Sequence, residues 1–238
     1  MHPSAATASA ACLVLLVGIG PAARGQEPAA AVPAGINDRF KDPELNVSEW
    51  IGRFEVESRE VFAARAEVLK ACDVRPGETV ADVGAGTGFY SQLFAQAVGR
   101  RGRVFAVDIA PKFLDHIEQR TQAEGLLNLT TVRAAQDSVR LAPESVDLVF
   151  VCDTYHHFES PQRSLASIFR CLRPGGRLVV IDFERVPGVT REWLLGHVRA
   201  GKEVFRQEIV DAGFVLRDEV RVEGFKENYL LRFKRPRE

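Results

Sequence analysis

Short apolar runs alternate with longer stretches of mixed polarity from about residue 76 to the end of the chain. The runs have the length of buried strands, and the stretches between them are long enough for helical crossovers. Continuous apolar strands that alternate with helices indicate a parallel sheet covered on both faces. We therefore predict an open, doubly wound α/β sheet over residues 76–238. The expected strands are Thr79–Val83, Arg103–Val107, Leu129–Arg133, Val146–Cys152, Arg177–Phe183, Val215–Val222 and Asn228–Phe233, and the expected helical regions are Tyr90–Val98, Pro111–Glu124, Pro161–Leu172 and Arg191–Ala212.

A helical pattern precedes the sheet. From Asn46 to Cys72 apolar residues recur at helical spacing with charged residues between them, and Arg75-Pro76-Gly77 then ends the pattern. We predict one helix here, within an N-terminal helical element of residues 46–75. The charged side chains of this helix face either a binding pocket or solvent.

The first 25 residues differ in composition from the rest of the chain. No charged residue occurs from Ala5 to Ala23, and small residues surround Arg24 ahead of Gln26. An apolar core followed by a small-x-small site is typical of a secretory signal, although no lysine or arginine precedes the core. We expect a signal over residues 1–25, a linker over 26–45 and a periplasmic or secreted protein. Two alternatives are an uncleaved membrane anchor and a cytoplasmic protein.

The net charge limits the expected partners, and the cysteine content limits the expected disulfide and metal sites. The formal net charge is -1, and the only locally basic segment is the tail from Leu231 to Glu238, so nucleic acid is not an expected partner. Cys72, Cys152 and Cys171 follow the leader. They are odd in number, lie mostly in apolar contexts and lack zinc-site spacing, which predicts core thiols and no metal. The oligomeric state is not predicted.

A glycine-rich turn follows the first expected strand in the segment VADVGAGTG. Its spacing is GxGxG, and Phe89 stands where a dinucleotide-binding motif has its third glycine. Asp82, just upstream, would repel a diphosphate but suits a cationic amine. Asp108 follows Gly88 by twenty residues, at a strand end where an acid can accept both hydroxyls of a ribose. An amine, a ribose and no phosphate together describe S-adenosylmethionine.

The chain from about Trp50 to Lys234 resembles the class I S-adenosylmethionine-dependent methyltransferases. VADVGAGTG is similar to their first motif, VFAVDIA to their second, VDLVFVCDTYHHF to their fourth, and CLRPGGRLVVIDF to the segment that leads into their fifth strand. The resemblance includes a bacterial subgroup whose members often begin with signal-like segments. It implies a mostly parallel, seven-stranded sheet whose last strand is antiparallel, and an N-terminal helical lid over the cofactor.

The resemblance also implies roles for individual residues. The glycines would lie under the methionine and ribose of the cofactor, Asp82 near its amino group, Asp108 at the ribose and Ile109 against the adenine. Either Gln136 or Asp137 would contact the adenine amine, with Asp137 favoured; the alternative for both residues is a helix N-cap on a surface loop. The residues expected around the cofactor are Asp82, Gly84, Ala85, Gly86, Gly88, Asp108, Ile109, Gln136, Asp137 and Cys152.

Candidates for catalysis follow the fourth strand, at Asp153, Thr154, Tyr155, His156 and His157. Transfer to a soft nucleophile needs little more than alignment, whereas a hydroxyl or an acidic carbon needs a base. We expect Tyr155, His156 and His157 to supply that chemistry or the pocket wall, with the alternative that one histidine is a structural residue under the sheet. His197, Arg199 and Lys202 lie either on the same rim, where they could read an anionic substrate, or on a solvated helix face.

Two functions of different classes follow. The first is a methyltransferase that acts on an O, N, C or S atom of a small molecule, favoured because Asp82, Asp108 and the three glycines are intact. The second is an exported protein that binds a ligand or senses it without turnover. The loop spacing disfavours a nicotinamide oxidoreductase, and the absence of an Asn-Pro-Pro-Tyr-type tetrad after the fourth strand disfavours nucleic-acid methylation.

Overall fold

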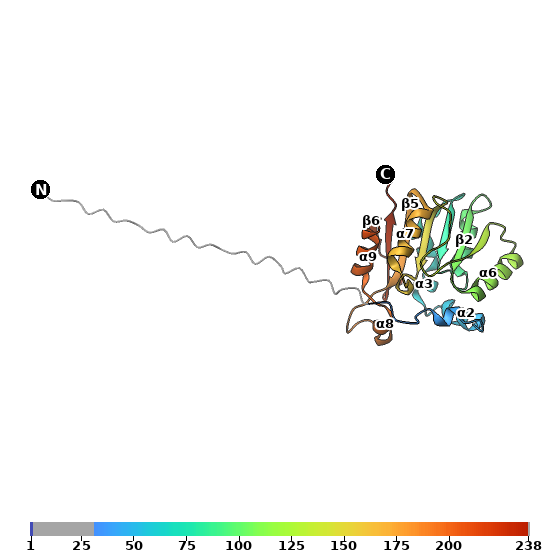
Figure 1. The fold of residues 1–238 in the computed structure, drawn as a ribbon, viewed down its shortest axis with the longest axis horizontal. Coiled ribbons are helices and arrows are strands. Elements are labelled where there is room, and N and C mark those ends of the chain that lie inside the picture. The colour runs from blue at the N-terminus through green and yellow to red at the C-terminus, as the bar shows by residue number, and fades with distance from the viewer. Residues whose placement is uncertain (2–30, 238) are drawn as a thin grey trace.

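The computed structural model describes Met1 and residues 31–237. Seven strands form one sheet in the order β3-β2-β1-β4-β5-β7-β6, with helices on both faces (Figure 1). This confirms the predicted α/β fold. The strands are β1 Thr79–Val83, β2 Arg103–Asp108, β3 Leu129–Arg133, β4 Val146–Cys152, β5 Leu172–Phe183, β6 Val215–Val220 and β7 Asn228–Lys234.

Strand direction and strand order create the site. Strand β1 pairs in parallel with both β2 and β4, whereas β7 pairs antiparallel with β5 and with β6. The chain builds β1, β2 and β3 outward to one side, then crosses back to place β4 on the other side of β1. Ligands of open α/β sheets bind beyond the carboxyl ends of the strands at such a reversal. The loops after β1 and β4 therefore meet at one place.

Alternate residues of the strands supply two separate cores. Val80 packs with Phe94 and Phe150 on one face, and Ala81 packs with Val149 and Phe205 on the other. Helices α5 Phe89–Val98 and α6 Pro111–Glu124 contact strands β1 to β3, and α7 Pro161–Cys171 and α9 Lys202–Asp211 contact β5 and β6. Burial on both faces explains why these strands are continuously apolar in sequence.

The single helix predicted over Asn46–Cys72 is wrong. The segment forms α2 Val47–Phe54, α3 Glu60–Ala63 and α4 Arg65–Cys72. Asn46 caps α2 by accepting hydrogen bonds from the backbone of Ser48 and Glu49. Helix α2 ends where Glu55 leaves helical geometry, and Arg59 then adopts extended backbone before α3. Arg59 forms a partly buried ion pair with Asp153 at 2.8 Å, a long-range contact that local helical spacing does not reveal.

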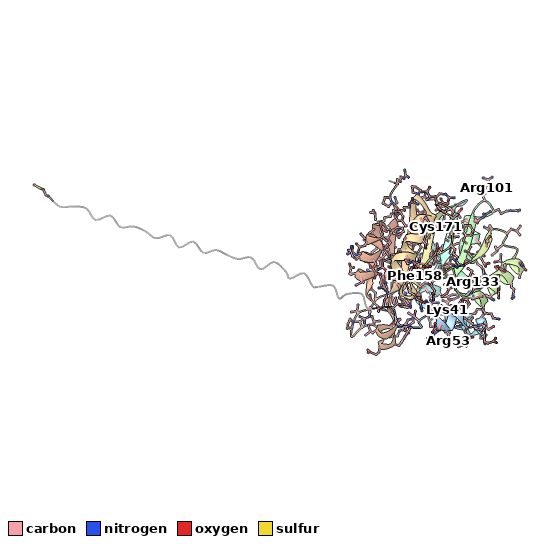
Figure 2. The ribbon with its side chains drawn as sticks, in the orientation of Figure 1. Lys41, Arg53, Arg101, Arg133, Phe158 and Cys171 are labelled. Atoms are coloured by element: carbon pink, nitrogen blue, oxygen red, sulfur yellow. The ribbon has the colours of Figure 1, made fainter. Side chains whose placement is uncertain are left out.

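The second half of the predicted linker is packed structure. Ile36 and Leu45 are buried, and the short helix α1 Asp38–Lys41 lies between them. Lys41 pairs with Glu159 at 2.9 Å, which places this segment beside the loop that carries Phe158 (Figure 2). The linker prediction is therefore wrong for residues 36–45. The predicted signal lies outside the described residues, and none of the helices described is long and apolar enough to cross a membrane.

The predicted helical region Arg191–Ala212 is two helices. Helix α8 spans Glu192–His197, and α9 begins after Gly201. Between them the chain is extended at Val198, which is buried with Ala200 in the core beneath α9. The break turns α8 toward the end of the sheet where α2 lies (Figure 1).

Gly88, at the start of α5, provides a test of the packing around the glycine turn. Its φ is +81°, and a Cβ there would lie 2.6 Å from Cγ1 of Ile117. Gly125, at the end of α6, also has positive φ but open space around its Cβ position. We expect Gly125→Ala to cost about 1 kcal/mol of unfolding free energy from backbone strain. Gly88→Ala should cost roughly 1–3 kcal/mol more because of overpacking. Urea denaturation of both variants measures the difference, and equal losses would contradict this packing.

Candidate functional site

A pocket of about 580 Å³ opens at the carboxyl ends of β1, β2, β4 and β5. The glycine turn after β1 forms its floor, and residues of α2, α3 and α8 border it from the N-terminal and C-terminal parts of the chain. It joins segments that are more than a hundred residues apart in sequence. Concave sites of this kind, with a few convergent polar groups, are the usual place for a small ligand.

Glycine is needed at different positions of the turn for different structural reasons. Gly84 has φ +76°, and a Cβ there would collide with the side chain of Thr154 at 2.2 Å, so this residue lets the loop after β4 approach. Gly86 has φ +54°, and its Cβ position faces Phe54 at 3.4 Å. Phe54 of α2 therefore lies over the turn. The bare backbone of Gly86 therefore faces an aromatic ring.

Asp108 fixes the glycine turn from the end of β2. One of its oxygens accepts a hydrogen bond from the backbone N–H of Gly86 at 2.8 Å, and the other accepts from Ala110 at 2.8 Å. The side chain is buried, and burial raises the pKa of its carboxyl. Each carboxylate oxygen has two acceptor positions. Asp108 therefore keeps one position on each oxygen for a ligand that donates two hydrogen bonds.

Asp82 lies in the neighbouring strand and has a different environment. Its carboxylate accepts one hydrogen bond from the Ser91 hydroxyl at 2.6 Å, and its side chain is only 3% exposed. Burial raises the pKa of Asp82 to about 7, and the nearby charge of Asp108 adds to the shift. A buried acid with a single hydrogen-bond donor suits a cationic partner inside the pocket.

The structure separates the two candidates for the adenine contact. Gln136 and Ile109 line the pocket, as do Ala85 and Cys152. Asp137 does not line it, because its carboxylate pairs with Arg163 at 2.5 Å on the outside of the loop. Of the two alternatives, Gln136 and not the favoured Asp137 is therefore the one placed to meet a ligand. Burial raises the pKa of the Cys152 thiol well above its ordinary value, so this residue is a wall and not a nucleophile.

Tyr155 is not part of the pocket. Its hydroxyl donates to Glu208 at 2.7 Å, and its ring packs edge-on against Phe205 with centroids 4.9 Å apart. Only 1% of the residue is exposed. The short helix Tyr155–His157 points this side chain into the core beneath α9, so the arrangement does not favour the catalytic role expected for it.

His156 and His157 both line the pocket, and each is held by one ring nitrogen. Nδ1 of His156 lies 2.8 Å from Asp182, and Nδ1 of His157 lies 3.1 Å from Oδ1 of Asn37. Burial lowers the pKa of His157 to about 2, with His156, His197 and Arg39 adding to the shift. His157 is consequently neutral at physiological pH, with its second nitrogen free.

Several residues of the site are not evident in the sequence. An aromatic wall of Phe40, Trp50, Phe54 and Phe113 stands beside the turn, with ring centroids 4.9 to 6.3 Å apart. Asp153, in left-handed backbone after β4, accepts hydrogen bonds from Arg59 and Asn228. Among these residues, only Asp153 carried a signal, since it is an acid at a strand end.

Comparison with known proteins identifies the domain. A family model described as a methyltransferase domain matches residues 81–180. The ubiquinone/menaquinone biosynthesis C-methyltransferase UbiE of Vibrio vulnificus is 30% identical over 112 residues, which are 47% of this chain and 43% of that protein. UbiE of Klebsiella pneumoniae strain 342 is 31% identical over 113 residues, covering 47% and 45%. The chain thus spans less than half the length of these curated relatives.

Solved structures match over a longer part of the chain. A SAM-dependent methyltransferase from Aquifex aeolicus superposes with a TM-score of 0.69 and 26% identity, over 80% of this chain and 98% of that one. The [4+2]-cyclase SpnF superposes with a TM-score of 0.63 at 17% identity, over 73% and 81%. The second likeness shows the fold alone.

Fold, motifs and family model agree on one family. The glycine turn and the two acids at the ends of β1 and β2 lie within the residues that the family model matches. The pocket has buried acceptors for an amine and for hydroxyl groups, and an aromatic wall beside which an adenine ring can lie. These features fit the amino group, the ribose and the adenine of S-adenosylmethionine. The chain therefore carries a class I S-adenosylmethionine-dependent methyltransferase domain, and the family and fold imply S-adenosylmethionine as its cofactor.

Proposed function

We propose that this protein transfers a methyl group from S-adenosylmethionine to a small-molecule acceptor. The observation that carries the proposal is the pair of buried carboxylates beside the glycine turn. Asp82 accepts a hydrogen bond from the Ser91 hydroxyl, Asp108 accepts from the backbone of Gly86 and Ala110, and both carboxylates line the same pocket. Two acids buried this close together are costly unless a ligand supplies a cation and hydroxyl donors.

The residues divide the pocket into two parts. Asp82 would hold the amine, Asp108 the ribose hydroxyls and Gln136 the adenine, while Phe54 closes over the turn. When bound, the cofactor supplies a methyl group activated by its sulfonium. Beyond that part, the pocket continues past Thr154 to Phe183, His197 and Trp193, and this remaining volume is the proposed acceptor site.

The acceptor is proposed to be a small organic molecule with a hydroxyl or an acidic carbon. The pocket is bordered by α2 and α8 rather than open to a long polymer, and the chain has no excess of positive charge. The similar UbiE proteins are named as C-methyltransferases, which favours an acceptor of this kind. His156 is held by Asp182 with its second nitrogen free, so it is the better arranged of the predicted bases.

A second candidate function is ligand binding without turnover. The [4+2]-cyclase of the same fold shows that this architecture does not by itself determine the reaction. Export through residues 1–25 is proposed on the signal-like sequence alone and would favour this second candidate, since S-adenosylmethionine is made in the cytoplasm.

Turnover distinguishes the two functions. The full chain is incubated with methyl-labelled S-adenosylmethionine and a panel of phenols, enolisable carbonyl compounds, amines and thiols, and S-adenosylhomocysteine release is followed. We expect label to enter an oxygen or carbon acceptor. Tight cofactor binding with no transfer to any member of the panel, or to a cell extract of small molecules, would support the binding protein instead.

Replacement of Asp108 tests the ribose assignment. Asp108→Asn keeps the size of the side chain but puts a donor where an acceptor is needed. We expect cofactor affinity to fall by about 1–3 kcal/mol, or roughly 5- to 150-fold. Asp147→Asn is the matched control, because Asp147 accepts the Thr79 N–H at 2.8 Å at the opposite end of the sheet. Calorimetry measures both, and an Asp108→Asn variant that binds like the control would overturn the assignment.

The pH dependence of binding tests the role of Asp82. Its carboxyl has a pKa of about 7, so it is largely neutral below that pH and ionised above it. An ammonium binds the ionised form, and affinity should therefore rise as pH rises from about 5.5 to 7, by up to about tenfold per pH unit, before the α-amino group of the ligand itself begins to lose its proton near pH 8. The Asp82→Asn variant should show a flat profile over this range. A parent profile that is equally flat would contradict contact between Asp82 and the amine.

A further inference from the structure

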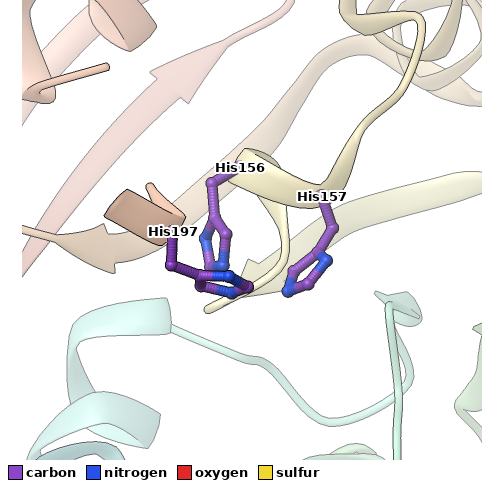
Figure 3. A group of neighbouring side chains, drawn as sticks. All are labelled: His156, His157 and His197. Carbon is purple, nitrogen blue, oxygen red and sulfur yellow. The ribbon is translucent and has the colours of Figure 1, made fainter. Parts of the chain in front are cut away.

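Three histidines meet at the acceptor side of the pocket. His156 and His157 follow β4, and His197 ends α8, forty residues later in the chain. One ring nitrogen can be taken from each residue so that all three nitrogens lie within 4.8 Å of one another. The ring centroids are 4.3 to 5.1 Å apart, and Figure 3 shows the rings gathered around a shared space. These three residues form a histidine triad.

Hydrogen bonds behind the triad determine which nitrogens are free. Asp182 is a carboxylate and can only accept, so Nδ1 of His156 donates to it and Nε2 keeps a lone pair. The Asn37 amide is oriented because its Nδ2 donates to the His157 carbonyl and to Glu159, each at 2.9 Å. Its Oδ1 therefore accepts from Nδ1 of His157. The buried His156 and the partly buried His157 therefore both present Nε2 as an unprotonated nitrogen.

This arrangement has the features of a metal site. Metal-bound histidines usually donate their other N–H to a carboxylate or an amide oxygen, which sets the tautomer and orients the ring. Three imidazoles with a fourth position open are the ligand set of catalytic zinc. In such a site the nitrogens lie roughly 3.3 Å apart, given Zn–N distances of about 2.0–2.1 Å. One nitrogen of each ring lies within 4.8 Å of the others, so metal binding requires the three rings to move closer together. His197 is half-buried at the end of a short helix.

The surrounding charges are compatible with a cation. Asp182 lies directly behind His156 and carries the negative charge nearest the triad. Arg39 is the positive group that faces His157 and His197, but it is exposed and lies over the Trp50 ring at 5.9 Å. It can turn to solvent. Packing alone does not require that ring nitrogens of three histidines come within 4.8 Å of one another.

We propose that His156, His157 and His197 bind a divalent transition-metal ion, with zinc as the best match. The fourth position would take water or an oxygen of the acceptor, and the ion would ease release of a hydroxyl proton to solvent water. The role in acceptor activation rests on the proposed function, and in this account the ion takes the place of His156 as a base. Sequence spacing did not predict this site, since His197 is brought in only by the turn before α9.

Metal binding is measured directly on the full chain without an affinity tag. The protein is treated with a chelator, dialysed and titrated with zinc chloride by calorimetry. We expect one zinc per chain, and His197→Ala should weaken binding at least 100-fold. His116→Ala is the matched control, because His116 on α6 does not line the pocket. Comparable weakening by both variants, or zinc binding by His197→Ala as tight as in the parent, would overturn the site.

A second measurement does not depend on any variant. Cobalt(II) replaces zinc in the chelator-treated parent, and visible absorption is recorded. Intense d–d bands of a four-coordinate site with nitrogen ligands are expected, and the weak spectrum of hexahydrated cobalt would overturn the proposal. S-adenosylhomocysteine is titrated separately into the metal-free parent. Its binding without zinc binding would leave the proposed function intact and remove the triad site, whereas zinc binding alone would support the site and count against the proposed function.

Discussion

The burial of two carboxylates side by side is the constraint on which the site depends. Strands β1 and β2 run parallel in a register that pairs Asp82 with Ala106 and Val83 with Val107, so Asp108 emerges one residue beyond Val107. Asp108 uses its charge to hold the Gly86 N–H, while Asp82 has only the Ser91 hydroxyl. An incompletely satisfied buried acid costs stability, on the order of several kcal/mol. A cationic ligand bound beside Asp82 would offset this loss of stability.

The remaining elements complete the site around this pair. The strand-order reversal brings the loop after β4 against the glycine turn, and Thr154 contacts Gly84 closely enough that no side chain fits there. The partly buried ion pair between Arg59 and Asp153 then ties the N-terminal helices to that loop. Phe54, the last residue of α2, lies over the turn. A contact between residues far apart in sequence therefore helps to hold the N-terminal helices beside the pocket.

The local sequence was sufficient to predict features whose pattern lies within one strand or loop. Buried strands, the glycine turn and the acids at strand ends were all predicted, because strand periodicity and loop chemistry are local. The features that were not predicted depend on contacts between residues far apart in sequence. The ion pair of Arg59 needs Asp153, the packing of Asn37 needs His157, and the triad needs α8 to turn beneath the sheet end. Tyr155 was misplaced for a related reason, since its partner Glu208 lies on a helix fifty residues away.

The most direct test of the account is calorimetric titration of the full chain with S-adenosylmethionine and S-adenosylhomocysteine, with NAD as a control. The buried acid pair predicts one site per chain, micromolar or tighter binding of both sulfur ligands and no binding of NAD, whose diphosphate would face Asp82. Binding of NAD, or no heat from any of the three with a protein shown to be folded by circular dichroism, would contradict it.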